Sequence, residues 1–155
     1  IEVVFTICVP KDDAVVLYNV KIINKRGDNR LIDGYFCINP APALSWHDAY
    51  GVADNDETLN GLLYSHDGFA LPNDFTKLFA GCDKKYDAYD LSPAEFKGVY
   101  NGYENPIALK NEKLSCMGAT FEAEYVAAFQ FRIFLQRGRN SKRHSALLRR
   151  EISKK

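Results

Sequence analysis

Three strand-like runs separated by short polar turns fill residues 1–39 and constrain the fold more than any other part of the chain. Each run is rich in β-branched residues, which fit the pleated surface of a sheet. The segments between them hold the proline, glycine and aspartate residues of tight turns. Because short turns join antiparallel neighbours, these runs predict a three-stranded antiparallel meander. The runs are Ile1–Val9, Ala14–Asn24 and Leu31–Ile38.

The pattern becomes helical after Pro40 and Pro42, which interrupt the strands because proline cannot donate a hydrogen bond to a sheet ladder. Short helices are predicted at residues 43–50, 56–66 and 73–80, since each carries apolar side chains at helical spacing and is followed by glycine. Asp54 or Asp56 would cap the second helix. A fourth helix is predicted to begin at the capping box Ser92-Pro93-Ala94-Glu95.

The segment Phe121–Leu135 fits both helical and strand spacing, but its second half alternates Phe129, Phe131 and Ile133 with polar residues. This alternation favours a returning aromatic strand. Beyond Gly138, a final helix is predicted at residues 142–153, with a thin apolar stripe. The fold class is therefore predicted as α+β: an antiparallel sheet with an N-terminal three-stranded meander, short central helices, the aromatic strand and a basic C-terminal helix. The domain would span residues 1–137, and residues 138–155 would form the basic helix or arm.

A length of 155 residues is enough for one domain with a sizeable hydrophobic core. No apolar run approaches the roughly 18–20 residues that a membrane-spanning helix needs. The first residues lack the basic region and cleavage site of a signal peptide, and no Asn-x-Ser/Thr site is present, which favours an intracellular chain. The four cysteines form no Cys-x-x-Cys pair and are interpreted as free thiols, with two disulfides as the alternative.

Charge is distributed very unevenly along a chain whose formal net charge is zero. Residues 132–155 hold nine of the 20 basic side chains and one of the 20 acidic ones, which leaves a body with a formal charge of about −8. This asymmetry predicts a charged partner: an acidic protein surface, or the chain's own acidic body in a homo-oligomer. The predicted binding residues in this stretch are Arg137, Arg139, Lys142, Arg143, Arg149 and Arg150.

The aromatic and acidic segment Tyr86-Asp87-Ala88-Tyr89-Asp90 is a second candidate binding feature. Tyrosine is enriched at interfaces because it combines apolar area with a polar tip. Tyr86 and Tyr89 are therefore predicted to receive a basic partner, with tyrosines at the edge of the core as the alternative.

Two His-Asp pairs, His47-Asp48 and His66-Asp67, flank the acidic residues 54–57. Histidine nitrogens and carboxylates bind divalent metals, which can activate water, so a metal-assisted phosphoester hydrolase is one alternative function. The structural alternative is that these aspartates and histidines cap the ends of a helix. The sequence contains no cofactor-binding motif.

The leading functional hypothesis from the sequence is a non-enzymatic interaction or assembly protein that docks on an acidic surface through its basic C-terminal segment. It depends on the charge asymmetry and on the lack of a compact catalytic motif. Nucleic-acid binding by the same segment is a further alternative, with phosphates as the contacts and a strong dependence on salt.

Overall fold

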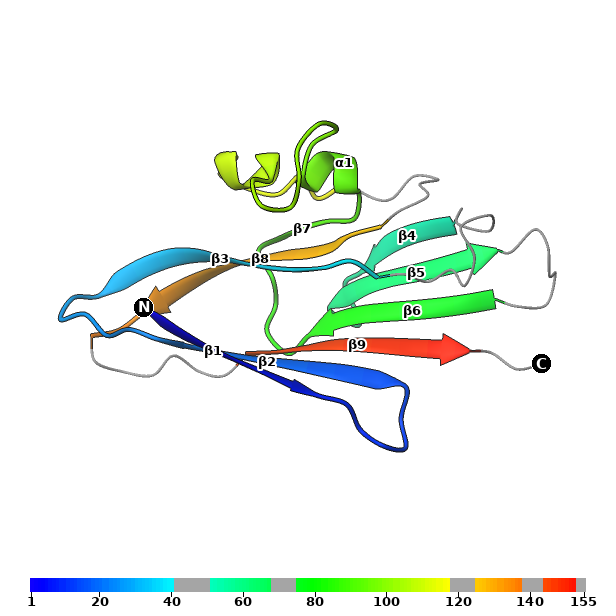
Figure 1. The fold of residues 1–155 in the computed structure, drawn as a ribbon, viewed down its shortest axis with the longest axis horizontal. Helices are drawn as coiled ribbons and strands as arrows, with labels where there is room; N and C mark the ends of the chain where they lie inside the picture. The colour runs from blue at the N-terminus through cyan, green and yellow to red at the C-terminus, as the bar shows by residue number, and fades with distance from the viewer. Residues whose placement is uncertain (41–50, 68–74, 118–124, 138–143, 153–155) are drawn as a thin grey trace.

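The computed structural model describes residues 1–40, 51–67, 75–117, 125–137 and 144–152, and it is almost entirely β-structure (Figure 1). The strands are β1 (Glu2–Cys8), β2 (Val15–Ile23), β3 (Arg30–Ile38), β4 (Gly51–Asp56), β5 (Gly61–Asp67), β6 (Phe75–Cys82), β7 (Ala88–Asp90), β8 (Ala127–Leu135) and β9 (His144–Ile152). The helices in the described part are the single turn α1 (Pro93–Phe96) and the 3₁₀ turn η2 (Ile107–Lys110). The α+β prediction is therefore wrong.

Two antiparallel sheets form the body of the molecule. The larger is six-stranded, in the order β1-β2-β9-β6-β5-β4, and the smaller is three-stranded, in the order β3-β8-β7. Figure 1 shows the segment with α1 and η2 lying over the smaller sheet, on the side away from the larger one. The larger sheet, the smaller sheet and this covering segment make three layers.

The N-terminal meander is only half present. β1 and β2 form the predicted hairpin in unbroken register, from Glu2 opposite Ile23 to Cys8 opposite Leu17. β3, however, pairs with β8 in the other sheet instead of with β2. The buried side chain of Asn24 holds the chain where it leaves β2, because its amide nitrogen donates to the carbonyl oxygens of Asp28 (2.7 Å) and Gln136 (3.4 Å). A short turn therefore joins two sheets here rather than two neighbouring strands.

The helix predicted at residues 56–66 is a turn followed by β5, and the described part of the helix predicted at 73–80, residues 75–80, belongs to β6. Asp56 does cap a turn, as its Oδ1 accepts hydrogen bonds from the backbone nitrogens of Thr58 (2.9 Å) and Leu59 (3.1 Å). That turn does not continue as a helix because Asn60 adopts a left-handed φ of 50°, which reverses the chain into β5. Leu62 and Tyr64 then both face the core, the two-residue period of a strand. The helix predicted at residues 43–50 lies outside the described residues.

The helix predicted at Ser92 does begin there, with Pro93 in its first position, but it ends after one turn. The Ser92 side chain makes no capping hydrogen bond in it. Gly98 follows with a positive φ of 87°, a conformation that glycine adopts without strain and that stops the helix.

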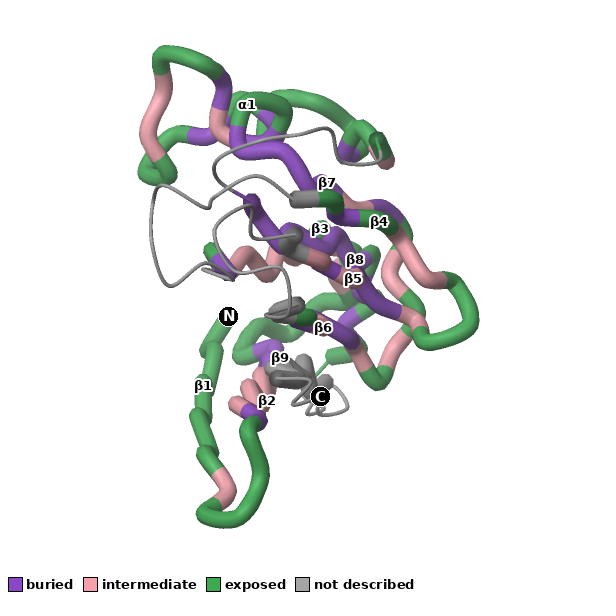
Figure 2. Tube along the Cα trace, turned by 90° about the vertical axis from the view of Figure 1, so that its right-hand side faces the viewer, coloured by how far each residue is buried: buried purple, intermediate pink, exposed green. Residues whose placement is uncertain are grey.

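The aromatic strand is confirmed as β8, the central strand of the smaller sheet. Its side chains alternate between two hydrophobic clusters. Phe129, Phe131 and Ile133 face the larger sheet and fill the main core, while Ala128 faces α1 and η2 on the opposite side. Residues 127–131 are therefore buried on both faces, and only beyond them do the outward residues become exposed (Figure 2).

The predicted C-terminal helix is a strand in the interior of the larger sheet. β9 pairs with β2 along one edge and with β6 along the other, so that Leu148 lies opposite both Val16 and Ala80. Figure 1 shows it between these two strands rather than projecting from the body. Local spacing indicated a helix, but ladders with two distant strands supply the hydrogen bonds of a strand.

All four cysteines are free thiols, which removes the disulfide alternative. Cys8 is exposed on β1, whereas Cys37 and Cys82 are half-buried. Burial, with a smaller contribution from a nearby aspartate, raises the pKa of both Cys37 and Cys82 to about 12.

These environments predict the order of thiol alkylation, because the thiolate is the nucleophile and must be reached by the reagent. At pH 8.5, we expect iodoacetamide to modify Cys8 first and to leave Cys37 and Cys82 unmodified in the folded chain. Peptide mass spectrometry after short reaction times measures this order. Modification of Cys37 as fast as Cys8, without loss of the fold, would contradict the half-buried position of the Cys37 thiol.

Candidate functional site

Three of the basic residues predicted to bind an acidic partner lie in the described part of the chain, and these three lie in or beside strands rather than in a projecting arm. Arg137 is exposed just after β8, where its backbone nitrogen donates to Asn29 Oδ1 (2.8 Å). Arg149 and Arg150 belong to β9, and Arg149 aligns with Val15 on β2 and Phe79 on β6. Arg139, Lys142 and Arg143 lie outside the described residues. Binding of this stretch to an acidic protein surface, to a second copy or to nucleic acid stays a prediction.

The His-Asp pairs are not shown to meet. His66 and Asp67 end β5, where His66 lies opposite Gly51 on one side and Thr76 on the other. His47 and Asp48 lie outside the described residues. Within the part of the chain that the structure describes, no three His, Cys, Asp or Glu side chains come close enough to hold a metal ion. No helix in that part is long and apolar enough to cross a membrane.

Tyr86 and Tyr89 do lie together, and they meet residues 54–57, which form the end of β4 and the first position of the turn that follows it. The rings of Tyr86 and Tyr89 pack edge to face with centroids 6.0 Å apart, and Tyr86 also packs on Phe129 of the core (5.1 Å). The Tyr86 hydroxyl donates to Asn55 Oδ1. We call these six residues the tyrosine–acid surface: Asp54, Asn55, Asp56, Glu57, Tyr86 and Tyr89.

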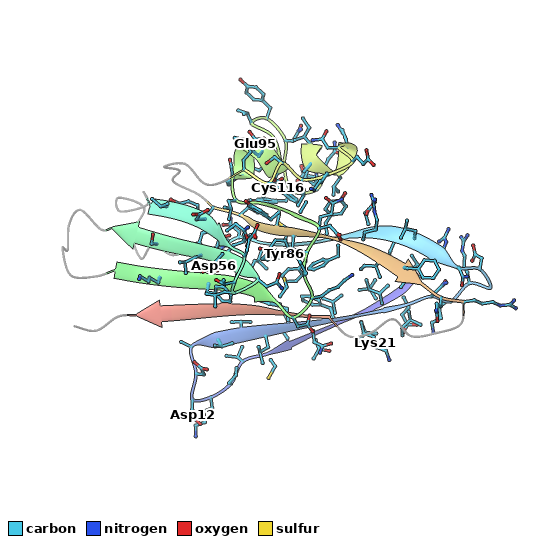
Figure 3. All side chains as sticks on the ribbon, turned by 180° about the vertical axis from the view of Figure 1, so that it is seen from behind. Asp12, Lys21, Asp56, Tyr86, Glu95 and Cys116 are labelled. Atoms are coloured by element: carbon cyan, nitrogen blue, oxygen red, sulfur yellow. The ribbon has the colours of Figure 1, made fainter. Side chains whose placement is uncertain are left out.

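The backbone holds the two halves of the tyrosine–acid surface against each other. The side-chain amide of Asn60, at the end of the acidic turn, donates to the carbonyl oxygens of Cys82 (2.6 Å) and Lys84 (3.1 Å). In return, the Cys82 backbone nitrogen donates to the Asn60 carbonyl oxygen (3.2 Å). These bonds fix the segment that leads to Tyr86 beside the β4–β5 turn, and Figure 3 shows Asp56 and Tyr86 near each other.

Burial and negative charge keep the tyrosines protonated. Burial, followed by Cys82, Tyr89, Glu57 and Asp56, raises the pKa of Tyr86 to about 12. The pKa of Tyr89 is raised by burial first and then by Cys116, Asp54, Glu57 and Asp90. A hydrogen bond from Thr58 lowers the pKa of Asp56, so that this side chain is ionised at neutral pH. The surface thus combines phenol donors with carboxylate and amide acceptors, a set that suits a cationic or a hydroxyl-rich ligand.

The bond between Tyr86 and Asn55 predicts a matched pair of substitutions. Tyr86→Phe removes the hydroxyl that joins β4 to the segment before β7, so we expect the free energy of unfolding to fall by about 1 kcal/mol. Tyr100→Phe is the control, because the Tyr100 side chain is 98% exposed, and we expect no measurable change. Urea denaturation of both variants measures the difference. Equal stability of the two would show that the Tyr86 hydroxyl contributes nothing.

A second feature, which the sequence analysis did not identify, is a hollow on the outer face of the smaller sheet. Its volume is about 420 Å³. Tyr35, Cys37 and Asn39 form one wall, and the opposite wall comes from the segment that carries α1 and η2. In the sequence, only the first wall is visible locally, as side chains two residues apart at the end of β3. The residues of the other wall lie some 60 positions later in the chain.

Comparison with known proteins identifies the architecture. The family model described as "Glycosyl hydrolase 94, supersandwich domain" matches residues 1–154. No curated protein matches the sequence. A solved structure titled "Putative kojibiose phosphorylase from human microbiome" superposes with a TM-score of 0.58 over 97% of this chain, at 8% sequence identity. The chain spans only 16% of the length of that protein, and at such low identity the likeness supports the fold alone.

Proposed function

Because the chain belongs to the family of glycosyl hydrolase 94 supersandwich domains, we propose that it is the supersandwich domain of a longer, carbohydrate-acting enzyme, a glycoside phosphorylase. The match over residues 1–154 carries this proposal. The two-sheet fold supports it, since the same arrangement of strands accounts for 16% of a protein titled as a phosphorylase. In such a reaction, inorganic phosphate displaces a sugar from the anomeric carbon. The glycosidic bond breaks, a C–O bond to phosphate forms, and the departing sugar oxygen takes a proton.

This family assignment corrects the functional interpretation of the sequence. The interpretation as a free-standing, non-enzymatic docking protein is contradicted, because the matching family model describes a domain of glycosyl hydrolases. As the function of the chain, a metal-assisted phosphoester hydrolase and a nucleic-acid-binding arm are contradicted by the same match. The contacts that the basic stretch makes with any partner stay a prediction. Half of the basic stretch that suggested docking, residues 144–152, is a strand of the larger sheet.

Within the longer enzyme, we assign this domain the role of a folded support that packs against the remaining polypeptide. β1 is the edge strand of the larger sheet, and every one of its residues is exposed. On one face, β1 exposes Val3, Phe5 and Ile7, and on the other face it exposes Val4. The one charged side chain of β1 is Glu2, at its first position, where it pairs with Lys25 (2.6 Å). A regular edge that is otherwise without charge is usually covered in a mature protein, because it can pair with other chains.

Phosphate dependence tests the proposed function. The full-length protein that contains this chain is incubated with glucose disaccharides, with and without inorganic phosphate, and the products are separated by anion-exchange chromatography. We expect a glycosyl phosphate and a free sugar to form in equal amounts, and only when phosphate is present. Free sugars released at the same rate without phosphate would instead identify a hydrolase. No reaction with any disaccharide, or in reverse with sugar 1-phosphates, would overturn the carbohydrate assignment.

A further inference from the structure

The hollow on the outer face of the smaller sheet is lined by two walls of different origin. Along β3, Ile32, Phe36 and Ile38 pack into the main core, so the alternation of the strand turns Tyr35 and Cys37 to the opposite side. Asn39 continues this row just beyond the strand. The facing wall consists of Phe96, Tyr103, Pro106 and Leu109.

A buried glutamine orients the polar group of the first wall. Gln130 is only 3% exposed, and its Nε2 donates to the Tyr35 hydroxyl oxygen (3.2 Å) and to the Glu112 carbonyl oxygen (3.0 Å). Its Oε1 accepts from the Leu114 backbone nitrogen (3.0 Å). The nitrogen and the oxygen of the side-chain amide are thus both hydrogen-bonded, which fixes the orientation of the amide. Because Tyr35 is the acceptor in the bond it makes with Gln130, its own proton remains for an acceptor in the hollow.

The second wall supplies aromatic surface in a fixed position. The rings of Phe96 and Tyr103 pack with centroids 6.3 Å apart, and Phe96 is buried in the outer cluster while Tyr103 is 41% exposed. The Lys97 ammonium lies 5.3 Å from the centroid of the Tyr103 ring and helps to hold it. The ring edge that remains exposed can pack on the carbon face of a ligand.

The aromatic surface of one wall and the polar groups of the other together indicate which kind of ligand fits the hollow. A volume of about 420 Å³ lies within the range of small-molecule sites, roughly 300–1,000 Å³. A hydrocarbon would fit the aromatic wall but would offer no acceptor to the Tyr35 proton and no partner to the Asn39 amide, which is unfavourable. A sugar ring has an apolar face of C–H groups and a rim of hydroxyls. It can contact the aromatic wall and pair with both polar groups at the same time.

We propose that this hollow is a carbohydrate-binding subsite, in which Tyr35 donates a hydrogen bond to a sugar oxygen, Asn39 pairs with a neighbouring hydroxyl, and Tyr103, supported by the buried Phe96 ring, packs on the sugar. The choice of a sugar as ligand rests on the proposed function of the enzyme as well as on these walls. Such a subsite would hold a saccharide on the supporting domain without taking part in the cleavage of its glycosidic bond.

Binding of glucose and kojibiose to the 155-residue chain tests the subsite by saturation-transfer-difference NMR, with a titration of each sugar. We expect saturable transfer from the aromatic protons to the C–H protons of the sugar. Tyr35→Phe, which removes only the hydroxyl, is expected to weaken binding about tenfold, the usual effect of one hydrogen bond to a ligand. Tyr100→Phe, on the same covering segment but outside the hollow, is expected to bind as tightly as the unmodified chain. No transfer, or equal binding by Tyr35→Phe, would overturn the proposal.

A second variant separates loss of the site from loss of the fold. Leu109 is half-exposed at the mouth of the hollow, so Leu109→Trp fills the space without removing a hydrogen bond. We expect this variant to retain its unfolding midpoint and to lose sugar binding; retained binding would exclude the hollow as the site. Cyclohexanol serves as a ring-shaped probe with a single hydroxyl, and tighter binding of cyclohexanol than of glucose would assign the hollow to apolar ligands. Phosphate-dependent activity of the full-length protein is a separate readout, so either proposal can fail alone.

Discussion

A chain that ends at Arg137 will not fold, because the missing segment contains the strand that joins the two parts of the larger sheet. Without β9, the β1–β2 hairpin has no neighbour, and β6 becomes an open edge of a three-stranded remnant. An isolated hairpin is marginal in water, and newly open edges promote aggregation. We therefore expect loss of near-ultraviolet circular dichroism, loss of cooperative unfolding in urea, and aggregation on concentration.

The matched control ends at Ile152, which removes Lys154 and Lys155 but leaves β9 whole. We expect this chain to unfold cooperatively near the midpoint of the unmodified chain. If the chain ending at Arg137 also unfolded cooperatively, β9 would be dispensable, and the basic stretch would be the separate arm that local spacing suggested.

The second large effect concerns two phenylalanines on opposite faces of β8. Phe129 is 1% exposed at the centre of the main core, where its ring contacts those of Tyr86 and Phe131. Phe129→Ala removes most of that ring, and we expect the free energy of unfolding to fall by about 3–5 kcal/mol. Phe134→Ala, on the same strand but with its side chain 59% exposed, should change it by less than about 0.5 kcal/mol.

Urea denaturation of both variants measures the two changes. The slope of the unfolding free energy against urea concentration is taken to be the same for each variant. Comparable losses from Phe129→Ala and Phe134→Ala would mean that β8 does not present one face to the larger sheet. That result would contradict the two-sheet core, which the burial of residues 127–131 on both faces requires.

Local patterns predicted the elements whose signals lie within a few residues. The β1–β2 hairpin follows from β-branched runs around a proline–aspartate turn, and the alternation of Phe129, Phe131 and Ile133 predicted β8 correctly. Such local patterns did not indicate which strands pair with one another. β3 continues a series of strands in the sequence, yet it pairs with β8, nearly 100 residues later. Nothing in its own residues distinguishes the two sheets.

The errors in helix prediction share one physical cause. Short segments such as residues 61–67 and 144–152 have apolar side chains that satisfy helical and strand periods alike. Their state is decided by hydrogen bonds to neighbours far along the chain: β5 lies between β4 and β6, and β9 lies between β2 and β6. The turn at Asp56 illustrates the same point, since a helix N-cap and a hairpin turn use the same carboxylate-to-backbone bonds, and the left-handed Asn60 selects the hairpin.

The candidate sites were visible from the sequence only in pieces. Tyr86 and Tyr89 were identified as a binding feature, and the acidic turn was identified separately as a helix cap or part of a metal site. The fold joins them through Asn55 and Asn60, roughly 30 residues before the tyrosines. For the hollow beside Tyr35, the residue that orients the phenol is Gln130, which the sequence shows only as the polar half of an alternating strand.

Amide hydrogen exchange tests whether β9, in the basic C-terminal stretch, is an interior strand of the larger sheet. Residues 146–149 are paired on both sides in the larger sheet, and residues 128–130 are paired on both sides in the smaller one, so the latter serve as an internal reference. We predict that amides 146–149 exchange as slowly as amides 128–130, through global unfolding. If amides 146–149 exchanged at the rate of an unstructured peptide while amides 128–130 stayed protected, β9 would not be an interior strand of the larger sheet.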